Sequence, residues 1–394
     1  MEGWKEYKFG GVVNINSDSI TSGYPHKWIK YLDTSSVTDN IFHQPISLEL
    51  SKAPSRAKRI VKSNSILYST VRPNLRHFGY IKAASDNLIA STGFAVITGK
   101  PITDTRFLFY WLTQESIIKY LTALAEAQTT TFPAINPSEF SDLDIDLPPL
   151  PLQHRIAEIL GALDDKIELN RQMNQTLEQI AQTMYKHYFV DDIDPDNLPE
   201  GWRNGVLGEI FNITMGQSPD GKSYNMVKAG ILFFQGRTDF GFRFPEARMY
   251  TSEPTRYAKK FDTLVSVRAP VGDINIAHDD CCVGRGLAAV QHKTIKPSFT
   301  FYTLKSLKND FDTFNGEGTV FGSINKDDFN RIPIVIPSNL TLTSFEGLAN
   351  PLDDLIFTNH NEILNLTLIR DFWLPKLISG DLIPSALQTI EQAL

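Results

Sequence analysis

The sequence predicts an α+β protein. Two similar mixed α/β domains should be joined by two long helices, packed as an antiparallel coiled coil with pseudo-twofold symmetry. Three observations predict this: the 394-residue chain repeats itself, each copy opens with a strand-rich block, and each copy closes with a helix that carries an apolar seam. The predicted boundaries are residues 1–150 and 201–338 for the domains, 151–190 and 339–380 for the spacer helices, 191–200 for an acidic linker and 381–394 for a C-terminal tail.

The repeat is visible by self-comparison. Trp4 and Trp202 lie 198 positions apart, and each is followed by a strand-like run, residues 9–14 and 207–212. Residues 65–72 then resemble residues 263–268. From Ile135 and Ile324 onward the offset is 189, and it stays constant through Leu177 and Leu366. A constant offset over about forty residues indicates a tandem duplication rather than a chance match.

Each copy ends in a heptad pattern, which is typical of paired helices. The seam positions are Ile156, Leu160, Leu163, Ile167, Asn170, Asn174, Leu177, Ala181, Met184 and Tyr188 in the first helix, and Phe345, Ala349, Leu352, Ile356, Asn359, Ile363, Leu366, Arg370, Trp373 and Leu377 in the second. Pro351 predicts a kink or a fresh start of the second helix, with Pro351 in its first turn.

Asn170 and Asn359 lie near the middle of their helices, so antiparallel packing should bring them together. A buried Asn contact there would fix the helix register. The alternative is that both side chains face solvent.

Composition is that of an ordinary soluble globular protein, with 42% hydrophobic and 21% charged residues. No apolar run approaches the roughly 20 residues of a membrane span, and the N-terminus does not resemble a signal peptide. Cys281 and Cys282 are neighbours, so we expect no disulfide framework and no zinc site; buried strand positions and a cytoplasmic location are expected instead. The net charge is −7, but residues 1–150 carry +1 and residues 201–338 carry +3. This distribution permits a local basic face.

Three segments resemble catalytic motifs, but each lacks the surrounding residues or elements that its motif needs. Residues 216–223 match the phosphate-binding P-loop pattern, but no helical pattern follows them and no apolar strand that ends in a Walker B-type Asp is evident. Residues 136–139 lack the second Pro and the aromatic residue of a DNA amino-methyltransferase loop. Asp164 and Lys166 have a spacing seen in nucleases, but they lie in a heptad helix, where a solvated charged face is expected. We therefore predict no catalytic residue and no metal site.

Several segments resemble specificity subunits of type I restriction–modification enzymes. Residues 147–160, with Gln153, resemble the opening of that family's central conserved helix, and residues 164–170 and 184–189 resemble its continuation. Residues 216–219 with Tyr224 and Asn225 resemble a segment of the recognition domains, and residues 374–382 resemble the C-terminal motif. Leu152 stands where the family often has Glu, and the second helix lacks the Gln and carries Pro351.

The resemblance implies that 1–150 and 201–338 are target recognition domains, each reading one half of a bipartite, asymmetric DNA sequence. It implies that the helices set the gap and dock two methyltransferase subunits, which restriction/translocase subunits then join. S-adenosylmethionine, ATP and Mg²⁺ would be bound by those partners and not by this chain.

Duplication guides the choice of DNA-binding residues. Because the half-sites differ, residues that both halves share cannot explain the difference. Arg72 and Arg268 are therefore expected either to contact phosphate or to form part of the scaffold. The expected base readers are Asn74, Arg76, Thr129, Thr130 and Thr131 in the first domain and Gln217, Ser218, Arg237, Arg243 and Arg285 in the second. The expected phosphate grips are Arg56, Lys58, Arg59 and Lys62 in the first and Arg256, Lys259 and Lys260 in the second.

Two other functions remain open from the sequence. A stand-alone P-loop nucleotide hydrolase would depend on Lys222. A scaffold of two repeated modules that does not bind DNA would show no gel shift on duplex DNA, either alone or with a methyltransferase partner.

Overall fold

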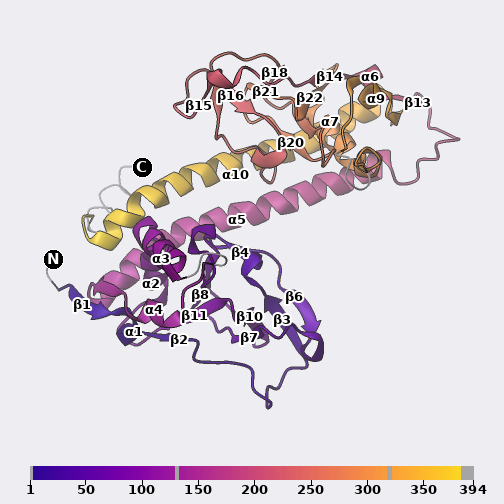
Figure 1. Ribbon diagram of the computed structural model, residues 1–394. Coiled ribbons are helices and arrows are strands. Elements are labelled where there is room, and N and C mark those ends of the chain that lie inside the picture. The colour runs from indigo at the N-terminus through magenta and orange to yellow at the C-terminus, as the bar shows by residue number, and fades with distance from the viewer. Residues whose placement is uncertain (1–2, 129–132, 317–321, 383–394) are drawn as a thin grey trace. The chain divides into compact units, whose positions relative to one another are not determined.

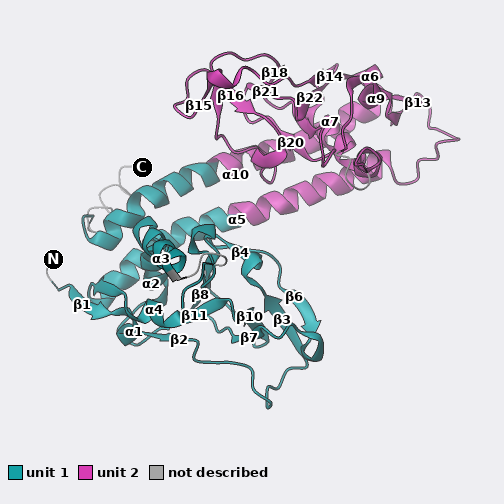
Figure 2. Cartoon of the chain, in the orientation of Figure 1, with its two compact units in different colours: residues 1–169, 362–394 teal, residues 170–361 magenta. Residues whose placement is uncertain are grey.

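The computed structural model describes residues 3–128, 133–316 and 322–382. The chain divides into two compact units (Figure 2): residues 1–169 with 362–394 form unit 1, and residues 170–361 form unit 2. Two long helices, α5 (Leu150–Phe189) and α10 (Asn339–Ser379), each contribute one stretch to each unit (Figure 1). Each unit is therefore a globular domain together with its own segment of both helices.

The domain of unit 1 contains three small helical segments and one longer helix besides its strands. The helices are α1 (Phe9–Val12), α2 (Thr105–Leu112), α3 (Glu115–Gln128) and α4 (Pro137–Ser141). The strands are β1 (Lys5–Lys8), β2 (Val13–Ile15), β3 (Trp28–Leu32), β4 (Val37–Thr38), β5 (Ile41–Phe42), β6 (Ile46–Glu49), β7 (Ala57–Ile60), β8 (Ser65–Ser69), β9 (Phe78–Ile81), β10 (Leu88–Ser91), β11 (Phe94–Gly99) and β12 (Asp144–Leu147).

The domain of unit 2 has the same kinds of element. Its helices are α6 (Leu207–Ile210), α7 (Pro297–Ser306), α8 (Lys308–Asp312) and α9 (Lys326–Arg331). Its strands are β13 (Arg203–Val206), β14 (Phe211–Met215), β15 (Tyr224–Asn225), β16 (Ile231–Phe234), β17 (Tyr250–Thr251), β18 (Tyr257–Ala258), β19 (Thr263–Ser266), β20 (Ile274–Ile276), β21 (Cys281–Val283), β22 (Leu287–His292) and β23 (Pro333–Ile336).

The sheets of the two domains share one topology, which confirms the predicted repeat. The order β2-β11-β8-β9 in unit 1 matches β14-β22-β19-β20 in unit 2, and the pair β1-β12 matches β13-β23. A second sheet in each domain is mixed, because β10 pairs parallel with β3, and β21 pairs parallel with β16. Cys281 and Cys282 are buried in β21, as expected.

The runs that follow Trp4 and Trp202 were expected to be strands, and that expectation is half wrong. Each begins as a single helical turn, α1 or α6, and only then continues as a strand, β2 or β14. In unit 1 the amide of Phe9 donates to the carbonyl of Leu143, and in unit 2 the amide of Leu207 donates to the carbonyl of Ile332. These long-range hydrogen bonds fix the helical turn, and no local sequence pattern predicts them.

In both units, α5 and α10 run antiparallel. In unit 1, Asp164 of α5 bonds to Arg370, whereas the later residue Lys166 pairs with the earlier residue Glu362. In unit 2, buried seam residues of both helices, such as Ala181 and Ile356, belong to the same hydrophobic core as the domain. The seam therefore buries apolar surface against the partner helix and the domain together, which explains why such long helices are stable.

The polar contact of the helix seam differs from the one expected. Asn170 and Asn359 are 0% and 5% exposed, so the solvent-facing alternative is wrong. The amide of Asn359, however, donates to the side-chain oxygen of Asn174 at 2.9 Å. The seam position one helical turn beyond Asn170 supplies the partner, because the stagger of two antiparallel helices is set by their packing against the domains and not by the midpoints of the helices.

Helix α10 passes through Pro351 without interruption, so a fresh start at that residue is wrong. A proline inside a helix loses one backbone hydrogen bond. Here Phe345, Ala349 and Ile356 on both sides of Pro351 are fully buried in the core of unit 2. Packing of these side chains outweighs the lost bond.

The two domains anchor to the helices by related polar contacts. In unit 1, Gln153 of α5 is buried, accepts a bond from the amide of Asp104 at 2.9 Å and donates to the carbonyl of Pro148 at 2.9 Å. In unit 2, Glu346 of α10 accepts bonds from the amides of Ser298 and Phe299, both at 3.0 Å, at the start of α7. Helix α10 lacks the Gln that α5 has. It uses the carboxylate of Glu346 instead to accept the free backbone amides at the start of α7.

Candidate nucleic-acid interface

Unit 2 contains an open cleft of about 730 Å³ between the ends of β14, β19 and the loop before β22. Arg268 and Arg285 are exposed and lie on its walls, and Gly216 and residues 322–325 complete its lining. A cleft of this size with two cationic side chains suits a nucleic-acid segment better than a small apolar ligand. Of the residues nominated from sequence, Arg268 and Arg285 line this cleft.

The segment that resembles a P-loop forms one rim of the cleft. The amide of Gly216 donates to Leu287, and the amide of Gln217 donates to Val283, so this segment continues the sheet. A Cβ atom on Gly216 would lie 2.2 Å from the carbonyl oxygen of Gly284, which requires glycine here. Residues 221–223 form one 3₁₀ turn that leads into β15 and not into an α-helix. The structure therefore lacks the helix N-terminus that a P-loop needs at this lysine.

Backbone pairing corrects the sequence match between the two arginines. In unit 1, Val71 forms an isolated antiparallel bridge with Ala134, and in unit 2, Arg268 forms the matching bridge with Ser323. Ala134 and Ser323 are separated by the constant offset of 189. Arg268 therefore corresponds to Val71, and Arg72 lies one position further along.

A second pair of bonds gives the same register. The amide of Arg72 donates to Pro133 at 2.8 Å, and the amide of Ala269 donates to Gly322 at 2.9 Å. Arg72 thus corresponds to Ala269, and the expectation that Arg72 and Arg268 are a shared pair is wrong. The sequence match aligns the two arginines because they are identical, whereas the strand pairing and the backbone bonds match residues 66–71 to residues 263–268 without a gap.

In unit 1, the nominated residues lie around the 3₁₀ turn at residues 73–75. Arg72 and Asn74 are exposed. The guanidinium of Arg76 is bound by two carboxylates, those of Asp39 and Glu115, so it is held by its own domain. Thr129, Thr130 and Thr131 lie outside the described residues.

The two predicted phosphate-gripping clusters overlap at equivalent positions. The carbonyl of Arg256 accepts a bond from the amide of Val283 at the end of β21, and the carbonyl of Arg56 accepts the matching bond from the amide of Thr92 beside β10. Lys62 and Lys259 lie further along the chain in each unit, and both are exposed. Each of these lysines already pairs with an aspartate, at 2.8 Å in both units. Arg56, Lys58 and Lys260 are exposed as well.

Arg243 does not belong to the interface, which corrects its assignment as a base reader. Its side chain is 2% exposed and bonds to Glu178 of α5, to Asp353 of α10 and to Tyr302 of α7. Burial acts to lower the pKa of this guanidinium, but the nearby Asp353, Tyr302 and Glu178 outweigh it and raise the pKa above its ordinary value. Arg243 is a charged side chain that fastens the domain to both helices.

Arg237 is half-exposed and pairs with Asp273. Ser218 lies beside the cleft, where its hydroxyl accepts a bond from the amide of Arg285 at 3.3 Å. Gln217 is exposed, and its carbonyl accepts a bond from the hydroxyl of Thr255. The structure therefore gathers Gln217, Ser218, Arg268 and Arg285 into one region of unit 2.

Sequence reasoning missed the buried anchors. Asp164, expected on a solvated face, is 8% exposed; it accepts bonds from the hydroxyl of Tyr110 at 2.7 Å and from Arg370 at 2.9 Å. Tyr302 makes the corresponding bond to Asp353 at 3.0 Å in unit 2. The signal was present in the sequence, because Asp164 and Asp353 share the offset of 189 that marks the duplicated helix.

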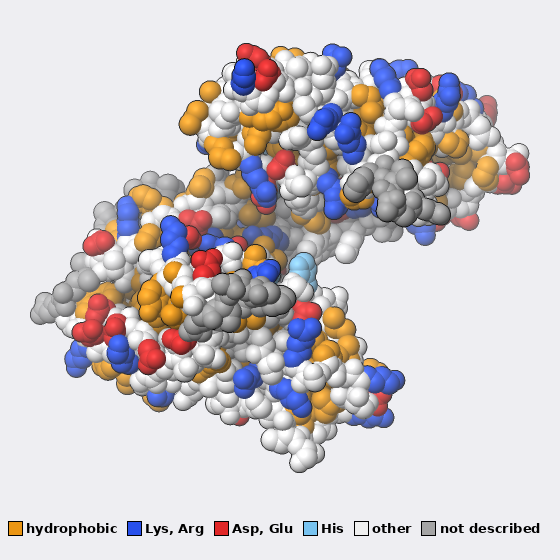
Figure 3. Space-filling model, viewed as in Figure 1, with side chains coloured by type: hydrophobic (Ala, Val, Ile, Leu, Met, Phe, Trp, Pro, Cys, Tyr) orange, Lys and Arg blue, Asp and Glu red, His pale blue; other side chains and the backbone are white. Residues whose placement is uncertain are grey.

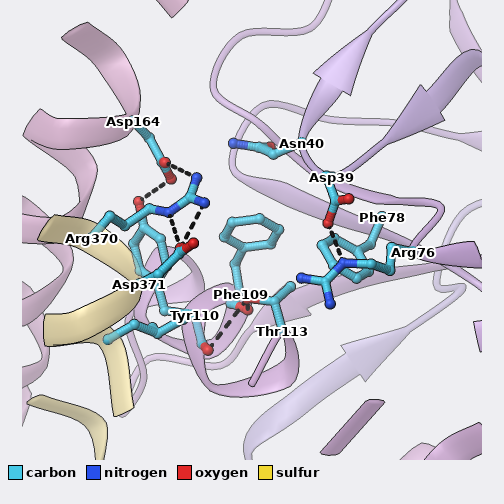
Figure 4. Close-up of a pocket in the computed structure, with 11 residues that line it drawn as sticks. Asp39, Asn40, Arg76, Phe78, Phe109, Tyr110, Thr113, Asp164, Arg370 and Asp371 are labelled. Carbon is cyan, nitrogen blue, oxygen red and sulfur yellow. Dashed lines mark hydrogen bonds and ion pairs between the residues drawn. The ribbon is translucent and has the colours of Figure 1, made fainter. Parts of the chain in front are cut away.

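A small cavity adjoins the Asp164 anchor in unit 1 (Figure 4). Asp164, Arg370 and Tyr110 lie on one side of it, and Arg76 with Asp39 lies on the other. Its volume of about 60 Å³ admits a few water molecules but no nucleotide. We regard it as part of the anchor and not as a ligand site.

On the visible face of each unit, Lys and Arg side chains are spread among acidic and hydrophobic ones and form no single basic patch (Figure 3). Within the described residues, no cluster of His, Cys, Asp and Glu is arranged to hold a metal ion. None of the helices in the described part of the chain is long and apolar enough to cross a membrane.

Known proteins match this chain over both halves. The family model described as "Type I restriction modification DNA specificity domain" matches residues 1–179 and 199–340. The putative type I restriction enzyme MjaX specificity subunit of Methanocaldococcus jannaschii is 34% identical over 269 residues, which cover 65% of this chain and 62% of that protein. The type I restriction enzyme HindI specificity subunit of Haemophilus influenzae is 25% identical, with 97% of this chain and 100% of that protein covered.

A solved structure, the S subunit of a type I restriction–modification system from M. genitalium, shares the fold with a TM-score of 0.62. It is 18% identical, and the match covers 95% of this chain and 96% of that one. The family model covers most of the chain and matches it twice, once in each repeat, in agreement with the duplicated topology. The chain therefore belongs to the type I restriction–modification DNA specificity family, whose role is DNA sequence recognition and not catalysis.

Proposed function

We propose that this chain reads a bipartite, asymmetric DNA sequence, with one half contacted by each domain. The observation that carries this proposal is a duplicated backbone whose equivalent positions bear different side chains, such as the half-buried Val71 against the exposed Arg268. A shared scaffold places each domain on DNA in the same way, and the differing side chains give each half-site its own sequence.

The paired helices fix the distance between the two half-sites in this proposal. Each helix is about 40 residues long, which corresponds to roughly 60 Å of α-helix. Its seam residues are buried in the core of a domain in each unit. A rod that is anchored in this way cannot be shortened without repacking a core.

The helices also offer surfaces for partner proteins, which we propose to be two methyltransferase subunits. Within unit 1, Leu364, Leu368 and Phe372 of α10 form a stripe at four-residue spacing and are 46–69% exposed. Within unit 2, Leu348 of α10 and Ile180 of α5 are about half exposed. Large apolar side chains exposed in a row are typical of helix surfaces that bind another protein.

The catalytic chemistry resides in the partners under this proposal. The methyltransferase subunits bind S-adenosylmethionine, and the restriction/translocase subunits bind ATP and Mg²⁺. This chain recognises the DNA sequence, sets the gap between the half-sites and provides the docking surfaces.

A domain exchange tests the proposal. The chain is expressed with its methyltransferase subunits, and the methylated sites in the host genome are read by long-read sequencing. Replacing residues 201–338 with the corresponding residues of another family member should change one half of the methylated sequence and leave the other half and the gap unchanged. A change in both halves, or in neither, would contradict the proposal.

A further inference from the structure

We infer that Arg268 and Arg285 determine which base pairs unit 2 accepts, and that each selects guanine. The inference rests on the proposed DNA recognition and adds to it the residues and the base. Arg268 was expected from sequence to be a shared phosphate contact, and the backbone pairing removes that expectation.

Both guanidinium groups are available to a ligand. Arg268 and Arg285 are exposed and line the same cleft. Neither pairs with a carboxylate in the parts of the chain that the structure describes. Lys259 and Arg237, also exposed in unit 2, are by contrast engaged, with Asp280 and Asp273. The cleft therefore holds two arginines whose charge no carboxylate of the described residues compensates.

The backbone beneath each arginine is fixed. Arg268 is bridged to Ser323, and the amide of Arg285 donates to the hydroxyl of Ser218. The neighbouring residue, Gly286, donates to the carbonyl of Gln235 at 3.1 Å. A held backbone reduces the entropy that a side chain loses on binding, so both positions are suited to directional contacts.

The positions of both arginines differ between the units, although their surroundings agree. The amide of Thr92 donates to Arg56 as the amide of Val283 donates to Arg256, whereas Gly93 and Gly286 accept equivalent bonds at 2.9 Å, so Arg285 lies in a two-residue insertion of unit 2. Unit 1 thus has Val71 where unit 2 has Arg268, and it has no counterpart of Arg285. On a shared scaffold, the residues that differ are the ones that can account for two different half-sites.

Guanine is the base that this chemistry favours. A guanidinium donates two parallel hydrogen bonds, which match the O6 and N7 acceptors of guanine in the major groove. The ammonium of lysine supplies the same charge without the planar fork. Substitution of arginine by lysine therefore separates base reading from phosphate contact.

The test uses the complex of this chain with its methyltransferase subunits, a plasmid library carrying random sequence, and S-adenosylmethionine. Methylated molecules are sequenced for the wild type and for Arg268→Lys, Arg285→Lys and Arg256→Lys. The first two variants should each lose about tenfold to a hundredfold preference for guanine at one position of one half-site. Arg256→Lys, at a position where unit 1 also has arginine, should keep every preference.

Arg268→Gln provides an independent variant, because glutamine pairs with adenine. It should shift the preference at the same position from guanine to adenine. If the lysine variants keep the wild-type preferences and lose only overall methylation, the two arginines contact phosphate and the inference is wrong. It is also wrong if both half-sites relax together. If the wild-type complex shows no bipartite preference, the proposed function itself fails, whatever the variants do.

Discussion

The guanidinium of Arg243 joins three elements of unit 2 at a single buried point. Its carboxylate partners, Glu178 and Asp353, lie 65 and 110 residues away in the chain. No local sequence pattern reports such a contact, and so the sequence suggested an exposed base reader. Removing one member of a buried ionic cluster leaves the others without compensation, which costs far more than loss of a surface pair.

Arg243→Met should lower the free energy of unfolding by about 3–5 kcal/mol, because it leaves the buried carboxylate of Asp353 without a cation, whereas Glu178 keeps its pair with Lys305. Urea unfolding of the full chain measures the change. Arg237→Met is the matched control: its pair with Asp273 is half exposed, and the expected loss is about 0–1 kcal/mol. Equal losses in the two variants would show that the buried cluster is not an anchor.

His360 of α10 makes unit 2 sensitive to acid. Burial, with a smaller contribution from His278, lowers the pKa of His360 to about 4. The unfolded chain binds this proton near pH 6.5. The stability contributed by the neutral ring is therefore complete above about pH 6.5 and is lost as the pH falls toward 4.

His360→Phe keeps an aromatic ring beside Phe244, whose ring centre lies 4.8 Å away, and removes the titration. The fall in Tm between pH 7 and pH 4.5 should be smaller than in the wild type, as measured by thermal unfolding. His187→Phe, at an exposed position of α5, should leave that fall unchanged. If His360→Phe has the same pH dependence as the wild type, the histidine does not contribute to it.

The contact between Asn174 and Asn359 is a buried polar pair in the seam of the two long helices. Asn359→Leu should cost about 1–3 kcal/mol, because the amide of Asn174 stays buried without this partner. The double variant Asn174→Leu/Asn359→Leu should recover most of that loss, since replacing both partners by apolar groups is nearly neutral. Urea unfolding of the two single variants and the double variant measures the coupling. Additive losses would mean that the two side chains do not interact.

The heptad pattern predicted both long helices, because a seam is a local property repeated many times. It could not predict the pairing of Asn359 with Asn174 or the passage of α10 through Pro351. Both depend on the packing of the helices against the domains, which is decided by contacts far apart in sequence.

Duplication of the chain made the fold predictable, since a repeated sequence implies a repeated topology. The candidate site could be predicted from the sequence only in part. Arg268 and Arg285 were both nominated, but the register that makes Arg268 the counterpart of Val71 rests on backbone bonds. The sequence match aligns Arg72 with Arg268 because the two residues are identical, and this alignment hides the register.

The paired helices, as proposed, measure the gap between the two half-sites. Seven residues, one heptad, are inserted in α5 between Leu169 and Asn170, and seven in α10 between Asn361 and Glu362, so that the contacts within each unit are kept. The insertion adds roughly 10 Å of helix, or about three base pairs of duplex DNA. Long-read mapping of methylated sites should then find both half-sites unchanged and the gap longer by about three base pairs. An unchanged gap in an active complex would contradict the account.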